Sequence, residues 1–238
     1  MIRKAFLPLL CCLLVAVASK AQSNCSDYLL LRENAKYELL TYDQKDRQTG
    51  RMTYHVRETD TSGDKVEATI QSQVYDNKGK LATEGDFKVG CEDGSIWMDM
   101  RSLMNRQNAM EGQPDMEMTV EGDKMLYPGN LQPGQSLEDG SMTMEMKNKG
   151  NGQSMMTMVM KVTDRKVEGK ESIKVPAGTY DSYKIKYNTE VENRAMGMKM
   201  PGMRLETVEY YVPGIGMVRS ETYRNGKLQS YTVLSKIE

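Results

Sequence analysis

Histidine is almost missing from this chain of 238 residues: His55 is the only one. A mechanism that needs two imidazoles is therefore excluded. Cationic residues are not in excess either, because the chain has 32 Lys and Arg residues and 33 Asp and Glu residues. A nucleic-acid partner is therefore not expected, since binding it requires a surplus of cations to neutralise phosphates. The Gly-x-Ser-x-Gly, P-loop, His-Glu-x-x-His and Gly-x-Gly-x-x-Gly motifs are absent. We therefore predict a non-enzyme with no catalytic residue, no metal site and no cofactor.

A hydrophobic run long enough to span a membrane is also lacking. The apolar stretch from Ala5 to Ala18 would form a helix of about 21 Å, whereas the hydrocarbon core of a bilayer is about 30 Å thick. Arg3 and Lys4 precede this stretch, and Ser19-Lys20-Ala21 follows it with small residues where signal peptidase requires them. Residues 1–21 are thus predicted to be a cleaved signal peptide.

The predicted mature chain starts at Gln22, and we expect it to be soluble, without a transmembrane segment, and either periplasmic or extracellular. Cys11 and Cys12 lie within the apolar stretch and lack the small residues that precede a lipoprotein cysteine. Lipidation is the minor alternative.

Cysteine is scarce after the predicted cleavage site, where only Cys25 and Cys91 remain. Their spacing fits neither a Cys-x-x-Cys redox motif nor a zinc knuckle. In an oxidising compartment two cysteines more often pair than stay free. We expect a disulfide that fastens the mature N-terminus to the body of the protein, in preference to a redox pair.

The commonest pattern is an alternation of apolar and polar residues, which is typical of β-strands with one buried face. The apolar positions of the clearest segments are Met52, Tyr54, Val56; Val66, Ala68, Ile70, Val74; Ile96, Met98, Met100; Met116, Met118, Val120; Tyr183, Ile185, Tyr187; and Tyr231, Val233, Ile237. In the first of these segments His55 falls among the polar positions of 52–56, so we expect it to be exposed. The fold class predicted is all-β, an antiparallel and strongly curved sheet that forms a half-barrel or barrel.

Turn residues separate these segments. Turns are predicted at Asp76–Gly79, Asn148–Gly152, Pro201-Gly202 and Arg224–Gly226. One short helix is expected from a cap at Asp99 to about residue 110. We expect a single domain over residues 22–238, and the alternative is two lobes that meet near residues 127–134, where prolines and glycines accumulate.

Methionine is abundant, with 21 residues, and much of it recurs at every second position. Two such rows flank the predicted turn at 148–152, and a third follows later: Met142, Met144, Met146; Met156, Met158, Met160; and Met196, Met198, Met200. Residues that are directly opposite in a hairpin share a face, so any register that pairs even positions with even positions places the first six methionines on one side.

Three interpretations of this methionine pattern stay open. The first is an ordinary core in which Met replaces Leu or Ile. The second is a pliable apolar groove, since the unbranched, polarizable Met side chain adapts to varied ligands. The third is a copper(I) site, because thioethers are soft ligands, although the rows have no neighbouring histidine.

Two motifs in the C-terminal half carry a family resemblance. They are Val175-Pro-Ala-Gly-Thr-Tyr-Asp-Ser-Tyr-Lys184 and Tyr210-Tyr-Val-Pro-Gly-Ile-Gly-Met-Val218. With Tyr42-Asp43 and Cys91-Glu-Asp-Gly94 in the N-terminal half, the chain resembles the TapB-like family of exported bacterial proteins of unknown function. The resemblance implies a curved β-sheet or half-barrel in the bacterial envelope, and it implies no activity.

We accordingly expect an exported, non-catalytic binding module whose partner is an apolar small molecule or lipid, or another envelope protein. The alternative is a structural or interaction β-domain with a filled core. A methionine-rich copper(I) carrier ranks below both. The predicted site is the six-methionine face at positions 142, 144, 146, 156, 158 and 160, together with the Cys25–Cys91 disulfide.

Overall fold

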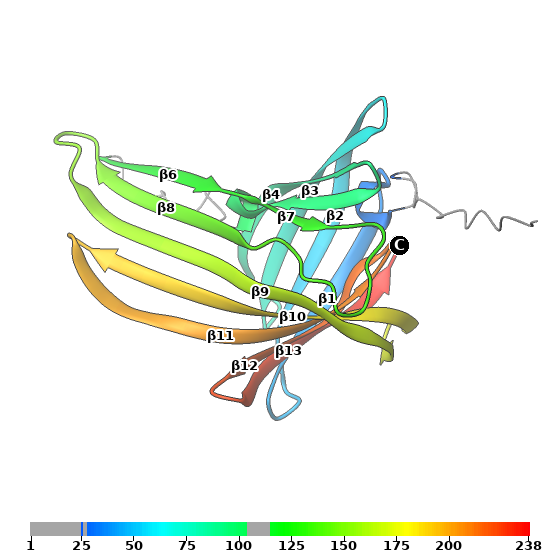
Figure 1. The fold of residues 1–238 in the computed structure, drawn as a ribbon. Coiled ribbons are helices and arrows are strands. Elements are labelled where there is room, and N and C mark those ends of the chain that lie inside the picture. Colours follow the sequence, from blue (N-terminus) through cyan, green and yellow to red (C-terminus); the bar gives the residue numbers. More distant parts are fainter. Residues whose placement is uncertain (1–24, 26–27, 104–114) are drawn as a thin grey trace, which may run out of the picture.

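The structure, a computed structural model, describes Cys25 and residues 28–103 and 115–238. One sheet of thirteen antiparallel strands curls into a nearly closed barrel (Figure 1). This confirms the predicted fold class. The strands are β1 (Lys36–Asp43), β2 (Gln48–Ser62), β3 (Lys65–Asp76), β4 (Leu81–Glu92), β5 (Ser95–Asp99), β6 (Met116–Gly122), β7 (Lys124–Tyr127), β8 (Gly140–Asn148), β9 (Ser154–Val175), β10 (Gly178–Ala195), β11 (Met198–Val212), β12 (Gly216–Arg224) and β13 (Lys227–Ile237).

The strand order is β6-β8-β9-β10-β11-β12-β13-β1-β2-β3-β4-β5-β7. The first and last long strands, β1 and β13, are therefore neighbours in the middle of the sheet. The two edge strands, β6 and β7, follow each other in the chain and are separated by Asp123 alone. The Asp123 N–H donates to the Ser141 carbonyl over 2.9 Å, and its own carbonyl accepts from the Met100 N–H over 3.0 Å. These bonds hold the two edges of the sheet close together.

Apolar alternate positions from most strands meet inside the barrel. Val56, Ile70, Val89 and Ile185 are fully buried there, and each contributes about 1.5–3 kcal/mol relative to an exposed side chain. A smaller cluster covers the outer side of β11–β13 around Val208 and Val218. Hence β11 buries both of its faces over Thr207–Tyr211, where Tyr210 and Tyr211 are consecutive apolar residues.

A disulfide joins Cys25 to Cys91, as the cysteine count predicts, with the two Cα atoms 5.5 Å apart. It fixes the start of the described chain to β4. The 3-10 helix η2 (Leu29–Leu31) follows, and its three leucines are buried in the interior cluster. The Leu29 N–H donates to the Gly214 carbonyl over 2.6 Å. The N-terminal segment is thus packed onto the barrel.

The turns at 76–79, 148–152 and 224–226 separate strands as predicted, but the turn predicted at Pro201-Gly202 is wrong. Both residues lie inside β11, and the reversal occurs at Met196 and Gly197, which have φ values of 48° and 78°. At Pro201-Gly202 the pairing of β11 with β10 shifts between Val191 and Asn193. A Cβ on Gly202 would lie 2.7 Å from the Val191 carbonyl oxygen. Proline and glycine mark a β-bulge here. A bulge tolerates proline, which has no backbone N–H to donate, and it favours glycine, whose missing Cβ lets the two backbones approach closely.

The helix expected after Asp99 is present only as a 3-10 turn, η3 (Met100–Leu103). The Asp99 carboxylate accepts a hydrogen bond from the Arg101 backbone N–H over 2.9 Å, as a cap would. The rest of that predicted helix, and the predicted signal peptide, lie outside the described residues. Residues 128–139, which include the proline- and glycine-rich segment, connect β7 to β8 within the same sheet.

Candidate functional site

The six methionines of the predicted face are brought together by the pairing of β8 with β9. Met142 lies opposite Met160, Met144 opposite Met158, and Met146 opposite Met156. Directly paired residues point to the same side of a sheet, and the buried members show that this side is the barrel interior.

The face extends beyond this hairpin onto both neighbouring strands. On β6, Met118 lies opposite Met146. On the other side, β10 supplies Val191, Asn193 and Ala195, which pair with methionines of both β9 and β11. We call the whole set the methionine face: Met118, Met142, Met144, Met146, Met156, Met158, Met160, Met198, Met200 and Met203.

Burial changes steadily along the methionine face. Met142 is 1% exposed and Met144 is 5% exposed, whereas Met156 is 38% exposed and Met198 is 67% exposed. The long strands β9, β10 and β11 run past the packed interior, so that their ends curve away from it (Figure 1). The methionine face therefore leads from the core to solvent at one end of the molecule.

The chemistry available on the methionine face is soft and apolar. In the part of the chain that the structure describes, no group of three or more His, Cys, Asp or Glu residues could hold a metal ion. His55 lies on β2, on the opposite side of the barrel wall from the interior cluster residue Val56. A metal on this face would therefore have thioether ligands without imidazole support.

A polar cluster also lies inside the barrel, and its tyrosines Tyr127 and Tyr211 belong to the same interior cluster as Met142 and Met144. Sequence reasoning did not find this polar cluster. Glu209, Arg165, Tyr127 and Tyr211 are all buried. The Tyr127 hydroxyl donates to the Glu209 carboxylate over 3.2 Å, and the Tyr187 hydroxyl lies near the same carboxylate. These residues come from four different strands, which hydrophobic periodicity does not relate to one another.

Arg165 is held by backbone carbonyls instead of by a carboxylate. Its two terminal nitrogens donate to the carbonyls of Glu138 over 2.7 Å and Leu126 over 3.1 Å. The guanidinium carbon lies 4.9 Å from the centre of the Tyr127 ring, close enough for a cation–π interaction. Arg165 thereby fixes the connection between β7 and β8 onto β9.

Burial controls the protonation of this cluster. It raises the pKa of Glu209, although Arg165 and the tyrosine hydroxyls act in the opposite direction. Burial also raises the pKa of Tyr127 well above its ordinary value, and the Glu209 charge adds to that shift. Two polar atoms, Arg165 Nε and the Tyr211 hydroxyl, are buried without a hydrogen-bond partner among the described residues.

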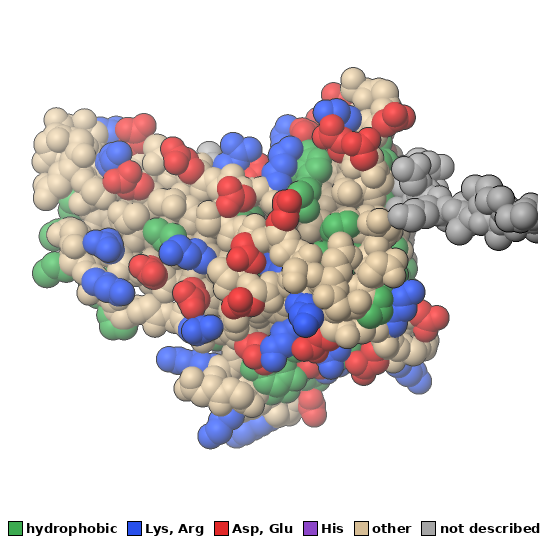
Figure 2. All heavy atoms as spheres, in the orientation of Figure 1, with side chains coloured by type: hydrophobic (Ala, Val, Ile, Leu, Met, Phe, Trp, Pro, Cys, Tyr) green, Lys and Arg blue, Asp and Glu red, His purple; other side chains and the backbone are tan. Residues whose placement is uncertain are grey.

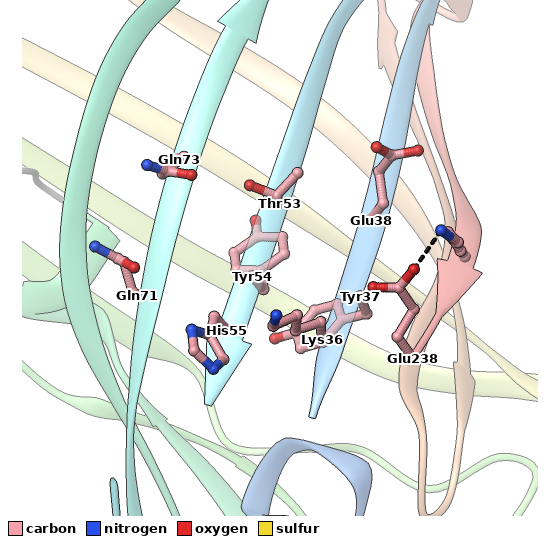
Figure 3. A pocket seen from close by; sticks show the side chains of 10 residues that line it. Lys36, Tyr37, Glu38, Thr53, Tyr54, His55, Gln71, Gln73 and Glu238 are labelled. Carbon is pink, nitrogen blue, oxygen red and sulfur yellow. Dashed lines mark ion pairs between the residues drawn. The ribbon is translucent and has the colours of Figure 1, made fainter. Parts of the chain in front are cut away.

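The outer surface has a separate hollow of about 320 Å³ over β13, β1, β2 and β3 (Figure 3). Its lining is polar: Lys36, Glu38, Thr53, His55, Gln71, Gln73, Lys236 and Glu238 surround it, with Tyr37 and Tyr54 contributing beneath. Lys236 and Glu238 form an ion pair at one side.

His55 is half-buried in this hollow, not freely exposed as expected. Partial burial lowers its pKa, and so do the positive charges of Lys36 and Arg57. This shift favours the neutral imidazole. Among the described residues no hydrogen bond or ion pair joins His55 to a carboxylate, since Glu38 pairs with Arg51 and Glu238 pairs with Lys236. The methionine face is the stronger candidate.

No helix among the described residues combines the length and the apolar character needed to cross a membrane.

Two solved structures are similar to this chain over 87% of its length and 96% of theirs. One is a protein from Parabacteroides distasonis described as a candidate lipoprotein, with a TM-score of 0.68 and 26% sequence identity. The other, from Bacteroides fragilis, is described as a candidate exported protein with a YmcC-like fold, with a TM-score of 0.64 and 27% identity. No curated protein matches the chain significantly in sequence.

A family model described as DUF3108-like matches residues 32–234. This agrees with the resemblance to an exported family without a known activity, whereas the TapB-like name itself is not confirmed. Because the match covers most of the residues, the chain belongs to the DUF3108-like family.

Proposed function

We propose that this protein is an exported, non-catalytic carrier or receptor that binds the acyl chain of a lipid on its methionine face. The observation that carries the proposal is the continuity of the methionine face, from Met142 in the core to Met198 in solvent. A hydrophobic core does not require this extension, because the methionines exposed to solvent are not buried and so contribute little to the stability of the fold.

The residue type supports an acyl chain as the ligand. Methionine is flexible and polarizable, so a surface made of it adapts to a chain that has no fixed shape. The solved neighbours described as a candidate lipoprotein and a candidate exported protein support an envelope location. An envelope protein meets acyl chains in every membrane it faces.

The test is binding of the apolar fluorescent dye N-phenyl-1-naphthylamine, followed by its displacement with a fatty acid. We expect Met158→Asn to weaken dye binding at least tenfold, because an amide would enter the apolar surface. Val159→Asn is the matched control: Val159 is the next residue on β9, is also half-buried, and points to the other side of the sheet. We expect it to bind dye as the wild type does.

Two outcomes would overturn the proposal. One is failure of the wild type to bind dye together with native mass spectra free of co-purified lipid. The other is equal loss of dye binding in both variants. Either result would favour the alternative of a structural β-domain with a filled core, for which the nearly complete burial of Met142 and Met144 is the supporting observation.

A further inference from the structure

Exposed methionines gather at one end of the barrel. The described residues include seven large apolar side chains that are exposed, and five of them are Met156, Met196, Met198, Met200 and Met203. We call these five the methionine rim. The remaining two, Leu81 and Ile237, lie on β4 and β13. An apolar patch of this kind on an otherwise polar surface marks an interaction site.

The methionine rim is built by two adjacent hairpins. Ala195, at the end of β10, pairs with Met156 on one side and with Met198 on the other. The Met196 N–H donates to the Met155 carbonyl over 3.0 Å, which ties the tip of the β10–β11 hairpin to β9. Figures 1 and 2 show these tips at the left end of the molecule, where green apolar side chains lie beside blue Lys and Arg side chains.

Charge at the tip of the β10–β11 hairpin has one sign, and Glu192 on β10 is the first acidic residue before this tip. Residues 193–203 contain Arg194 and Lys199 and no acidic residue. The two cations are exposed and lie directly opposite each other in the register of β10 and β11. Neither takes part in the ion pairs found among the described residues. Like charges opposite each other destabilise a sheet, so folding alone does not explain this pair.

We propose that the methionine rim docks on the surface of an anionic phospholipid bilayer. Apolar side chains that enter the headgroup region, flanked by cations that meet anionic lipids, form the usual combination of an interfacial anchor. A second copy of this chain fits less well, because a two-fold contact would bring Arg194 and Lys199 of both copies together.

This inference rests on the proposed function and extends it. The methionine rim is the solvent-exposed end of the methionine face, since Met156, Met198, Met200 and Met203 belong to both sets. A barrel docked at the methionine rim has the exposed end of the methionine face in contact with the membrane. An acyl chain then moves between bilayer and barrel without crossing water.

The experiment is co-sedimentation of the purified protein with vesicles. One set contains phosphatidylglycerol and phosphatidylethanolamine, and the other contains phosphatidylcholine alone. We expect binding to the anionic vesicles that weakens with added salt. Arg194→Glu combined with Lys199→Glu removes two attractive charges, each worth about fivefold in affinity, and should abolish measurable binding. Met198→Ser combined with Met200→Ser should also weaken it.

Matched controls come from exposed residues elsewhere on the barrel. Lys227→Glu reverses a cation at the β12–β13 turn, and Leu81→Ser removes an exposed apolar side chain on β4. We expect both to bind vesicles as the wild type does. All of these positions are exposed, so none of the substitutions should disturb the core.

Three results would overturn the docking proposal: no vesicle binding, equal binding to both vesicle types, or a concentration-dependent dimer that the rim variants abolish. The last would make a second copy the occupant. Dye binding separates this failure from failure of the proposed function, because Arg194→Glu with Lys199→Glu leaves the methionines in place. If dye binds but vesicles do not, lipid binding stands and membrane docking falls.

Discussion

The Tyr127 hydroxyl and the Glu209 carboxylate, 82 positions apart in the chain, hydrogen bond across the barrel interior over 3.2 Å. Tyr127 is the last residue of the edge strand β7. Glu209 belongs to β11, which is far from β7 in the strand order of the sheet. The Tyr127 ring also stacks on Tyr211, with centroids 4.7 Å apart. A buried polar contact of this kind fixes where the edge of a nearly closed sheet must lie.

Stability should fall with rising pH because of Glu209. Its pKa is raised in the folded protein, mainly by burial, so the folded state holds a proton that the unfolded state has already lost. The free energy of unfolding therefore decreases as the pH rises from the ordinary glutamate pKa, 4.5, toward the folded value. Glu209→Gln keeps the side-chain shape and should remove this slope in urea denaturation.

The opposite slope is expected at lower pH and serves as an internal control. Hydrogen bonds from Arg47 hold the pKa of Asp43 at about 2. A lowered carboxyl pKa stabilises the fold above the unfolded pKa, and this contribution is lost as the pH falls toward 2. Glu209→Gln should leave this acid limb unchanged. A variant with the same slope as the wild type above pH 4.5 would contradict the assignment to Glu209.

Two interior tyrosines should respond oppositely to loss of their hydroxyls. Tyr127→Phe removes a donor from the buried Glu209 carboxylate and should lower the free energy of unfolding by about 1–3 kcal/mol. Tyr211→Phe removes a buried hydroxyl that lacks a partner among the described residues, so stability should stay the same or rise. Urea denaturation at fixed pH compares them. Equal losses in both variants would mean that the Tyr211 hydroxyl is satisfied in solution, for example by a buried water.

The methionine pairing illustrates what alternation predicts well. Because the side-chain period of a strand is two, any even-to-even register places Met142, Met144 and Met146 on the side of Met156, Met158 and Met160. The strand segments and the curved sheet follow from the same period. The alternation of apolar and polar residues is enough to predict a strand and its buried side chains wherever one face of that strand is buried.

Other features depend on partners that local pattern does not identify. Pro201-Gly202 has turn composition, but a β-bulge uses the same residues, and the reversal falls at Met196-Gly197 instead. Arg165 and Glu209 are single polar residues within strand patterns, and only the tertiary fold shows that they are buried close to Tyr127. The alternation along β2 correctly predicts that His55 points outward. Its partial burial, however, is due to side chains of β1, β3 and β13 that line the same hollow.

Reduction of the Cys25–Cys91 disulfide should destabilise the protein. Closing a loop over 66 positions is worth about 4 kcal/mol on the chain-entropy model. We expect the double variant Cys25→Ser, Cys91→Ser to show a lower urea midpoint and to lose its sensitivity to dithiothreitol. Thiol titration of the unfolded, unreduced wild type provides the check. Two reactive thiols there would contradict the disulfide.

The buried end of the methionine face should reject charge and accept leucine. Met144→Asp places an unpaired carboxylate in the core and should cost several kcal/mol, roughly 3–5. Met144→Leu conserves volume and should cost less than about 1.5 kcal/mol. Met198→Asp, at an exposed position of the same face, should stay within about 0.5 kcal/mol of the wild type. Urea denaturation of the three variants measures this gradient, and tolerance of Asp at position 144 would show that this end of the face is open to water.

The leucine variants also test for metal binding, because leucine cannot ligate copper. Thermal melts with added copper(I) should show no specific stabilisation. A tight copper-dependent rise in melting temperature, present in the wild type and lost in Met144→Leu and Met158→Leu, would instead identify the methionine face as a metal site.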